Sequence, residues 1–330
     1  MRQPDNQKWE QSMPKPEVAT TSQPGPAPHL ARDPGEPRRL TGASASLRRL
    51  AVSPCERFLA SGAVNGEIRL WEIETGQCRR ILTGHTSPVE ALAFGDLGIR
   101  LASASRDGTI RIWSYRMGRC TYVLQGHPFP IPALAISADG ERIASGDRDG
   151  TIKTWRIHPP KVQSILKGSK GGIAGLAFTP DGTGLSSADC SGSFTKWDLR
   201  TKQPEHTCEA HHGPVTAWAA SADRQKIATG GQDGTVRIWD VLQCRCVQTI
   251  HLGKRPVLAL TLNDEPSLLG MADGRGHAQV LPLPHQAGRE PLAVKVPPDR
   301  KDGGAGAVLF GSGRCFAVAG PDRAVRIWQF

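Results

Sequence analysis

The tryptophans of this 330-residue chain recur at a constant interval, and this interval limits the possible folds more than any other feature. Five of them lie 42 residues apart, at Trp71, Trp113, Trp155, Trp197 and Trp239. A glycine precedes each of them in the same register, from Gly66 to Gly234. A fixed period of about 40–45 residues indicates an array of similar structural units stacked side by side.

Each period contains four short apolar segments separated by turn residues. In one period they are RRILT, VEALAF, RLASA and TIRIW, at residues 79–83, 89–94, 100–104 and 109–113. Segments of this length, rich in β-branched and apolar residues and bounded by Gly, Pro and Asp, predict strands. No long segment has the apolar period of a helix. We therefore expect an all-β fold built of four-stranded propeller blades.

The two ends of the chain predict how many blades there are. The segment that ends at Trp328 is followed by only two residues, so the last unit lacks a fourth strand. Residues 37–52 align with residues 79–94 at an offset of 42, which gives RRLT at 38–41 the place of an outermost strand. We expect seven blades, with this N-terminal strand completing the last blade and closing the ring.

The N-terminal segment differs in composition from the rest. Residues 1–37 contain eight prolines and few periodic apolar residues. Such a segment cannot bury enough apolar surface to offset the entropy lost on ordering. The sequence thus predicts a disordered, Pro-rich tail over residues 1–36 and a seven-bladed propeller over residues 37–330.

The repeated phrases, such as GH followed by LASASRDGTIRIW, resemble the WD-repeat β-propeller family over about residues 37–330. The resemblance implies a buried hydrogen-bonded chain of His, Ser or Thr, Asp and Trp within a blade. Transferred to this sequence, the chains are His85, Ser103, Asp107 and Trp113 in blade two, His127, Ser145, Asp149 and Trp155 in blade three, and His211, Thr229, Asp233 and Trp239 in blade five. Blade four departs from the pattern, with Ser169 in place of His and Ser191 in place of Asp.

These sets contain the residue types of a catalytic triad, but a structural role explains them better. They recur in three blades, end on a Trp, and satisfy buried polar groups. We therefore expect no enzymatic activity. No cofactor or metal is expected either, because His211 already has a structural role and Cys244 and Cys246 would face opposite sides of a strand.

Composition also suggests a cellular compartment. No run of about 18 apolar residues is present to cross a membrane, and the first twenty residues have no apolar core of a secretory signal. The eight cysteines form no C-x-x-C pair, which favours reduced thiols. We expect a cytoplasmic protein, with the nucleus as the alternative, that is neither secreted nor inserted into a membrane.

Variable residues at the blade rims are the candidates for function. The residue before each turn Asp and the loop after each Gly-His are expected to lie on one rim of the ring, here called the top rim. The basic residues and the one aromatic residue expected on the top rim are Arg106, Arg148, Phe129, Lys170, Arg48, Lys254 and Arg255. Guanidinium groups beside an aromatic anchor favour an acidic or phosphorylated peptide. The alternative is that these are only solvated loop charges.

The sequence leaves three functional classes open. The first is a non-catalytic scaffold that binds other proteins, as part of a multi-protein complex, through the top rim. The second is a nucleic-acid-associated propeller, because the chain carries a net charge of +10 and basic surfaces attract phosphate backbones. The third, least favoured, is a propeller enzyme. Aromatic residues make up only 5% of the chain, which argues against extensive base stacking.

Overall fold

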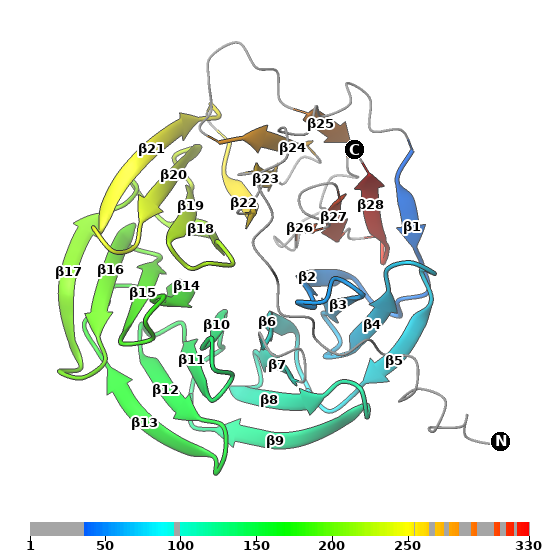
Figure 1. The fold of residues 1–330 in the computed structure, drawn as a ribbon, viewed down its shortest axis with the longest axis horizontal. Helices are drawn as coiled ribbons and strands as arrows, with labels where there is room; N and C mark the ends of the chain where they lie inside the picture. The colour runs from blue at the N-terminus through cyan, green and yellow to red at the C-terminus, as the bar shows by residue number, and fades with distance from the viewer. Residues whose placement is uncertain are drawn as a thin grey trace, which may run out of the picture.

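Each repeat forms one antiparallel sheet of four strands, as the sequence predicts. The computed structural model describes residues 36–95, 100–253, 255–263, 268–273, 277–283, 292–295, 307–310, 315–319 and 322–329. Within these residues all regular elements are strands, numbered β1 to β28. Seven four-stranded sheets are arranged around a central axis (Figure 1), which makes the fold a seven-bladed β-propeller. No helix of the described part is long and apolar enough to cross a bilayer.

The first three blades follow the order of the chain. Blade one contains β2 (Leu47–Val52), β3 (Phe58–Ala63), β4 (Ile68–Glu72) and β5 (Cys78–Leu82), blade two contains β6 (Val89–Phe94), β7 (Arg100–Ser105), β8 (Thr109–Ser114) and β9 (Arg119–Gln125), and blade three contains β10 (Ala133–Ile136), β11 (Arg142–Gly146), β12 (Ile152–Arg156) and β13 (Lys161–Leu166). In each blade the first strand lies nearest the axis and the fourth lies outermost (Figure 1).

Blades four to six continue in the same way. Blade four contains β14 (Ile173–Phe178), β15 (Gly184–Asp189), β16 (Ser193–Asp198) and β17 (Gln203–Glu209), blade five contains β18 (Val215–Ala220), β19 (Lys226–Gly231), β20 (Thr235–Asp240) and β21 (Arg245–His251), and blade six contains β22 (Val257–Asn263), β23 (Leu268–Asp273), β24 (His277–Pro282) and β25 (Leu292–Lys295).

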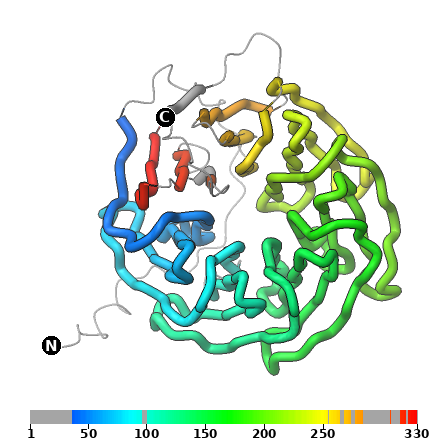
Figure 2. Tube along the Cα trace, turned by 180° about the vertical axis from the view of Figure 1, so that it is seen from behind, coloured from blue at the N-terminus to red at the C-terminus, as the bar shows by residue number. Residues whose placement is uncertain are grey.

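Blade seven joins the two ends of the described chain. It contains β26 (Ala307–Phe310), β27 (Cys315–Ala319), β28 (Val325–Gln329) and, as its outermost strand, β1 (Arg38–Leu40). β1 pairs antiparallel with β28, with Arg38 opposite Ile327 and Leu40 opposite Val325. Both tube and ribbon views place the two strands side by side (Figure 2). The prediction that an N-terminal strand closes the ring is therefore confirmed.

The predicted tail falls almost entirely on residues 1–35, which lie outside the described residues. Its disorder and the domain boundary at residue 37 therefore stay predictions.

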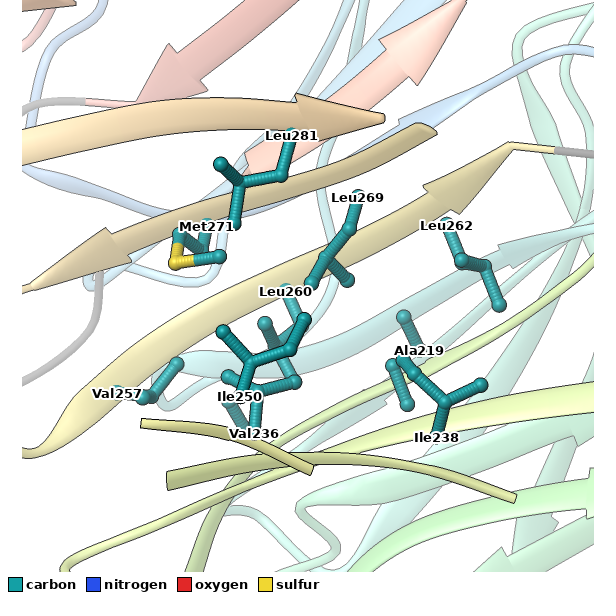
Figure 3. Packing of buried hydrophobic residues seen from close by; sticks show 12 residues of the cluster. Ala219, Val236, Ile238, Ile250, Val257, Leu260, Leu262, Leu269, Met271 and Leu281 are labelled. Carbon is teal, nitrogen blue, oxygen red and sulfur yellow. The ribbon is translucent and has the colours of Figure 1, made fainter. Parts of the chain in front are cut away.

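The apolar core lies between neighbouring blades, because each sheet buries both of its faces against the next. At the junction of blades five and six, Val236 and Ile238 on β20 face Leu260 and Leu269 (Figure 3). Leu281 joins this cluster with only 2% of its surface exposed. It stands one 42-residue step beyond Trp239, so an aliphatic side chain fills the space that a Trp occupies in the earlier blades.

One irregularity recurs in the pairing of the first two strands of a blade. The register between the first two strands shifts at the start of β2, β6, β14, β18 and β22. The shift skips one residue of each inner strand, such as Arg48 between Leu47 and Arg49, or Glu90 between Val89 and Ala91. A bulge of this kind leaves one residue unpaired and redirects its side chain. The skipped residues of blades one and two, Arg48 and Glu90, form an ion pair at the top rim.

Candidate functional site

The polar chain expected in blade two is present. The indole Nε1 of Trp113 donates to Ser103 Oγ at 2.8 Å. His85 contacts the same Ser103 Oγ through Nε2 at 2.7 Å and Asp107 Oδ2 through Nδ1 at 2.9 Å. Each polar side-chain group in this hydrogen-bonded set of blade two thus has a partner, which is what buried polar groups require.

Blade five carries the same arrangement. Trp239 Nε1 donates to Thr229 Oγ1 at 2.9 Å, and His211 Nε2 lies 2.8 Å from that oxygen. His211 Nδ1 lies 3.2 Å from Asp233 and 3.0 Å from Thr235 Oγ1. The chain of contacts again runs from the indole to a carboxylate at the turn.

Blade three uses a different carboxylate from the one predicted. His127 Nε2 and Trp155 Nε1 lie 2.7 and 2.8 Å from Ser145 Oγ, as expected. His127 Nδ1, however, contacts Asp147 Oδ2 at 2.8 Å. The prediction that Asp149 fills this role is wrong. Asp147 is only 1% exposed, and its other oxygen accepts the backbone N–H of Asp149. Asp149 itself is exposed, since it stands at the tip of the turn.

Blade four also has a carboxylate, although the sequence suggested that it lacked one. Ser169 donates its hydroxyl to Asp189 Oδ2 at 2.5 Å, and Trp197 Nε1 donates to Ser187 Oγ at 2.8 Å. Asp189 stands 42 residues after Asp147, so blades three and four use the same register. Because Ser169 is too short to replace an imidazole, no contact joins these two pairs among the described residues.

The three histidines are held neutral by their surroundings. Burial lowers the pKa of His85, His127 and His211, and the neighbouring carboxylates offset this only in part. A neutral ring fits the contacts, since Nδ1–H donates to the carboxylate while Nε2 accepts from the hydroxyl. Their side chains are 0% exposed, so no substrate can reach them and the role is structural.

The top rim is defined by backbone hydrogen bonds that tie each turn to the start of the inner strand. The N–H of Arg106 donates to Pro88 O at 3.0 Å, and the N–H of Arg148 donates to Pro130 O at 3.1 Å. Gln232 repeats the bond with Pro214 in blade five. Arg106, Arg148 and Gln232 therefore lie where the inner strands of their blades begin, at one end of the channel around the central axis.

A single buried carboxylate gathers three arginines at this mouth. Glu90, with 3% of its side chain exposed, lies 3.2 Å from Arg48 Nη1 and 3.7 Å from Arg49 Nη2. The Nε of Arg106 also contacts Glu90 Oε1. Arg49 Nε donates in addition to the backbone oxygen of Glu90 at 2.6 Å. We call these four residues, together with Arg148, the arginine cluster.

Arg48 was expected as an exposed rim charge, and this part of the prediction is wrong. Its side chain is 11% exposed and is paired with Glu90. The cause is the bulge at the start of β2, which is matched in β6. Arg48 and Glu90 are the skipped residues of neighbouring inner strands, one 42-residue step apart, so their side chains meet between the blades.

The remaining charges of the cluster are more accessible. Side chains of Arg49 and Arg106 are 32% and 39% exposed, and Arg148 is exposed. Burial lowers the pKa of Arg49; Glu90 raises it, and the positive charges of Arg48, Arg106 and Arg148 lower it further. Arg148 forms no ion pair with the described residues. One carboxylate is therefore paired with three guanidinium groups, and the charge of a fourth, Arg148, acts on Arg49.

The other predicted rim residues are distributed unevenly. Phe129 is 44% exposed and adjoins Pro130, which accepts the bond from Arg148. Lys170 is exposed and precedes Gly171 and Gly172, whose backbone lies against residues 148 and 190. Arg255 belongs to a separate group on blade six, with Asp273 at 3.3 Å and His277 at 2.9 Å. Lys254 lies outside the described residues.

Below the arginine cluster the inner strands enclose a channel of about 440 Å³. Its walls are mainly small or apolar, for example Leu92, Leu134 and Trp218, with Arg49 and Glu90 near one end. Arg224, which follows β18, donates across to Ile136 O at 3.4 Å. The channel thus has an arginine near each end.

Three residues of this site were missed by sequence reasoning: Glu90, Arg49 and Asp147. A signal for Arg49 exists in the repeat. The position of Arg49 is Ala or Gly in the next five blades, at residues 91, 133, 175, 217 and 259. A charged side chain at a position where the other blades have Ala or Gly indicates a role beyond the repeat structure.

Comparison with known families identifies the repeats. The family described as WD domain, G-beta repeat matches residues 36–72, 76–114, 118–156, 160–198 and 202–240, which together make up more than half of the chain. A comparison with curated proteins finds no match. The periodic Trp, the Asp-Gly turns and the seven closed blades agree with the family assignment. The chain therefore belongs to the WD40-repeat family of β-propellers.

Proposed function

We propose that the protein is a non-catalytic scaffold that binds an acidic or phosphorylated segment of a partner protein at the arginine cluster of the top rim. The observation that carries this proposal is the charge imbalance at the mouth of the channel. Three guanidinium groups from two blades are paired with one buried carboxylate, and the positive charge of Arg148 on a third blade acts on Arg49 as well. A peptide carboxylate or phosphate would neutralise the excess positive charge.

The arrangement favours an extended ligand over a point-like one. Arg106 and Arg148 stand at equivalent positions of neighbouring blades, and Phe129 lies in the loop beside Arg148. An exposed aromatic ring next to charge-assisted hydrogen bonds is typical of a binding hot spot. Arg48 and Glu90 serve as the buried base of the site, because their pairing orients Arg106 from below. Lys170 extends the basic surface towards blade four.

The structure suggests which substitutions test the proposal without unfolding the protein. Arg106→Glu would set a second carboxylate against buried Glu90, so that change is unsuitable. Arg148→Glu combined with Lys170→Glu reverses two exposed charges that have no ion pair among the described residues. The matched control is Arg119→Glu with Lys161→Glu, which reverses two exposed charges at the starts of β9 and β13, on the opposite rim.

The experiment compares the proteins captured by the wild type, the top-rim variant and the control, using quantitative mass spectrometry. Synthetic peptides from the acidic or phosphorylated regions of a captured partner are then titrated by fluorescence anisotropy. A charge-assisted hydrogen bond contributes about 1.5–3 kcal/mol, so the top-rim variant should bind at least about tenfold more weakly. Equal affinity of the two double variants for these peptides would refute the proposal.

The competing class, a nucleic-acid-associated propeller, is supported by the net charge of +10. It differs in its salt dependence, because each neutralised phosphate releases counterions. Titration of a mixed-sequence RNA or DNA oligonucleotide at several salt concentrations measures this slope. A steep slope that the top-rim variant reduces, without any captured protein partner, would favour nucleic acid over a peptide.

A further inference from the structure

The inner strands carry a ring of large apolar side chains in the wall of the channel below the arginine cluster. The ring occupies one position of the 42-residue repeat, and it consists of Leu50, Leu92, Leu134, Leu176, Trp218 and Leu260. Its members on β2, β6, β10 and β18 are only partly buried, although they pack against the cores between the blades. Because all six line the channel, the accessible part of these side chains faces its interior.

One member of the ring is a Trp, and the neighbouring blade has space for it. Trp218 lies against Gly175 of β14, where a Cβ atom would stand 2.1 Å from the Trp218 Cγ. The equivalent position is Ala in blades two, three, five and six. The indole also stacks on Phe194, with ring centroids 6.1 Å apart. Gly175 thus lets the larger side chain lie along the wall, and the channel keeps a volume of about 440 Å³, which lies within the range of ligand-binding pockets.

The first residues of the inner strands form the entrance of the channel at the top rim. The register shifts at the starts of β6 and β14 skip Glu90 and Ala174, and both residues line the channel. A strand rises about 3.4 Å per residue, so Leu92 lies about 7 Å farther along the channel than Glu90. Neighbouring Cα atoms of an extended peptide are about 3.8 Å apart. A peptide whose acidic group reaches the arginine cluster can therefore direct the side chain of its next residue towards the apolar ring.

We propose that the partner segment carries a bulky apolar residue, such as Leu or Phe, next to its acidic or phosphorylated residue, and that this apolar side chain enters the channel. The inference rests on the proposed function, because the arginine cluster holds the acidic residue at the entrance. Leu92, Leu134 and Trp218 offer apolar surface below the charged pair of Arg49 and Glu90. Burial of an apolar side chain against that surface is favourable, whereas a charged side chain would be desolvated among aliphatic groups.

Synthetic peptides test the proposal with the full-length protein. Two host peptides built of Gly and Ser carry either a pair of Glu residues or one phosphoserine, followed by a guest residue that is Gly, Ala, Leu or Phe. Each peptide is labelled with fluorescein and titrated by fluorescence anisotropy. In the host series that binds, the Leu and Phe guests should bind at least about tenfold more tightly than the Gly guest, because they bury a whole side chain.

One substitution separates the channel from the arginine cluster. Ala174→Phe places a large ring at the entrance, at a partly buried residue that strand pairing skips. The matched control is Ala138→Phe, the same change at an exposed residue of the turn between β10 and β11, on the opposite rim. Ala174→Phe should reduce the ratio of Leu-guest to Gly-guest affinity to about one, whereas Ala138→Phe should keep the wild-type ratio. Arg148→Glu with Lys170→Glu should weaken the binding of every guest.

The outcomes distinguish this inference from the proposed function. Equal affinity of the wild type for the Gly, Leu and Phe guests, in a host series that binds, would overturn the inference alone. An unchanged affinity ratio in Ala174→Phe would overturn it as well, since the apolar side chain would then bind outside the channel. Absence of binding in both host series, with every guest, would overturn the proposed function and the inference together. The wild-type titrations decide even where Ala174→Phe does not fold.

Discussion

At the scale of single residues, the turn before the third strand of each blade offers two positions for the carboxylate that the histidine contacts. Asp107 and Asp233 use the later position. Asp147 uses the earlier one. The segment Asp147-Arg148-Asp149 carries an Asp at both, so the sequence could not distinguish them. The choice depends on which side chain points inward from the turn, and this is a property of backbone geometry.

The corrected assignment predicts different effects of two neighbouring substitutions. Asp147→Ala leaves the Nδ1–H of His127 and two backbone N–H groups of the turn without their acceptor. Losing a buried partner costs about 1–3 kcal/mol. Asp149→Ala removes an exposed side chain and should change the free energy of unfolding by less than about 0.5 kcal/mol. Guanidinium unfolding midpoints of the two variants check this, and equal midpoints would contradict it.

The lowered pKa values of the histidines predict how stability depends on pH. Burial keeps His85, His127 and His211 neutral in the folded protein, whereas an unfolded His has a pKa of about 6.5. The unfolded chain therefore binds more protons below that pH. The free energy of unfolding should be level above about pH 7 and should fall as the pH drops from about 6.5 to about 5.

Denaturant unfolding at a series of pH values measures this dependence. Carboxylates contribute in a lower range, since Asp181 has a pKa of about 2 in the folded protein against about 3.9 for an unfolded Asp. The loss of stability between about pH 6.5 and about pH 5 is thus attributable to the histidines. Stability that does not vary in this window would show that the three rings are not held neutral.

At the scale of elements, the strands follow from the sequence while their irregularities do not. The predicted segments at 89–94 and 109–113 correspond to β6 (Val89–Phe94) and β8 (Thr109–Ser114). Alternating apolar residues and Asp-Gly turns define these strands locally. The bulge that skips Arg48 and Glu90 arises from the fit between neighbouring blades, and no local pattern marks it. For this reason Arg106 and Arg148 could be placed on the rim in advance, but the buried carboxylate beneath Arg106 could not.

At the scale of the whole molecule, ring closure links residues that are nearly three hundred positions apart. Leu40 on β1 is 2% exposed and belongs to the core between blades seven and one. Arg39 reaches Asp322 at 3.1 Å, and Asp322 also contacts Arg326 on β28. Arg38 donates to the backbone oxygens of Ile73 and Glu74 in blade one. The N-terminal strand therefore holds blade seven to blade one as well as completing blade seven.

Two truncations separate the role of this strand from that of the segment before it. Deleting residues 1–34 leaves β1 and its contacts with the other described residues in place, so the Tm should stay within about 2 °C of the full-length value. Deleting residues 1–45 removes β1, exposes the edge of β28 and uncovers the core around Leu40. Burial of one Leu side chain contributes about 1.5–3 kcal/mol, and the backbone pairing and the Asp322 contacts add to it. We expect a decrease in Tm on the order of 10 °C, measured by circular dichroism. Equal melting temperatures for the two truncations would show that the ring does not depend on its N-terminal strand.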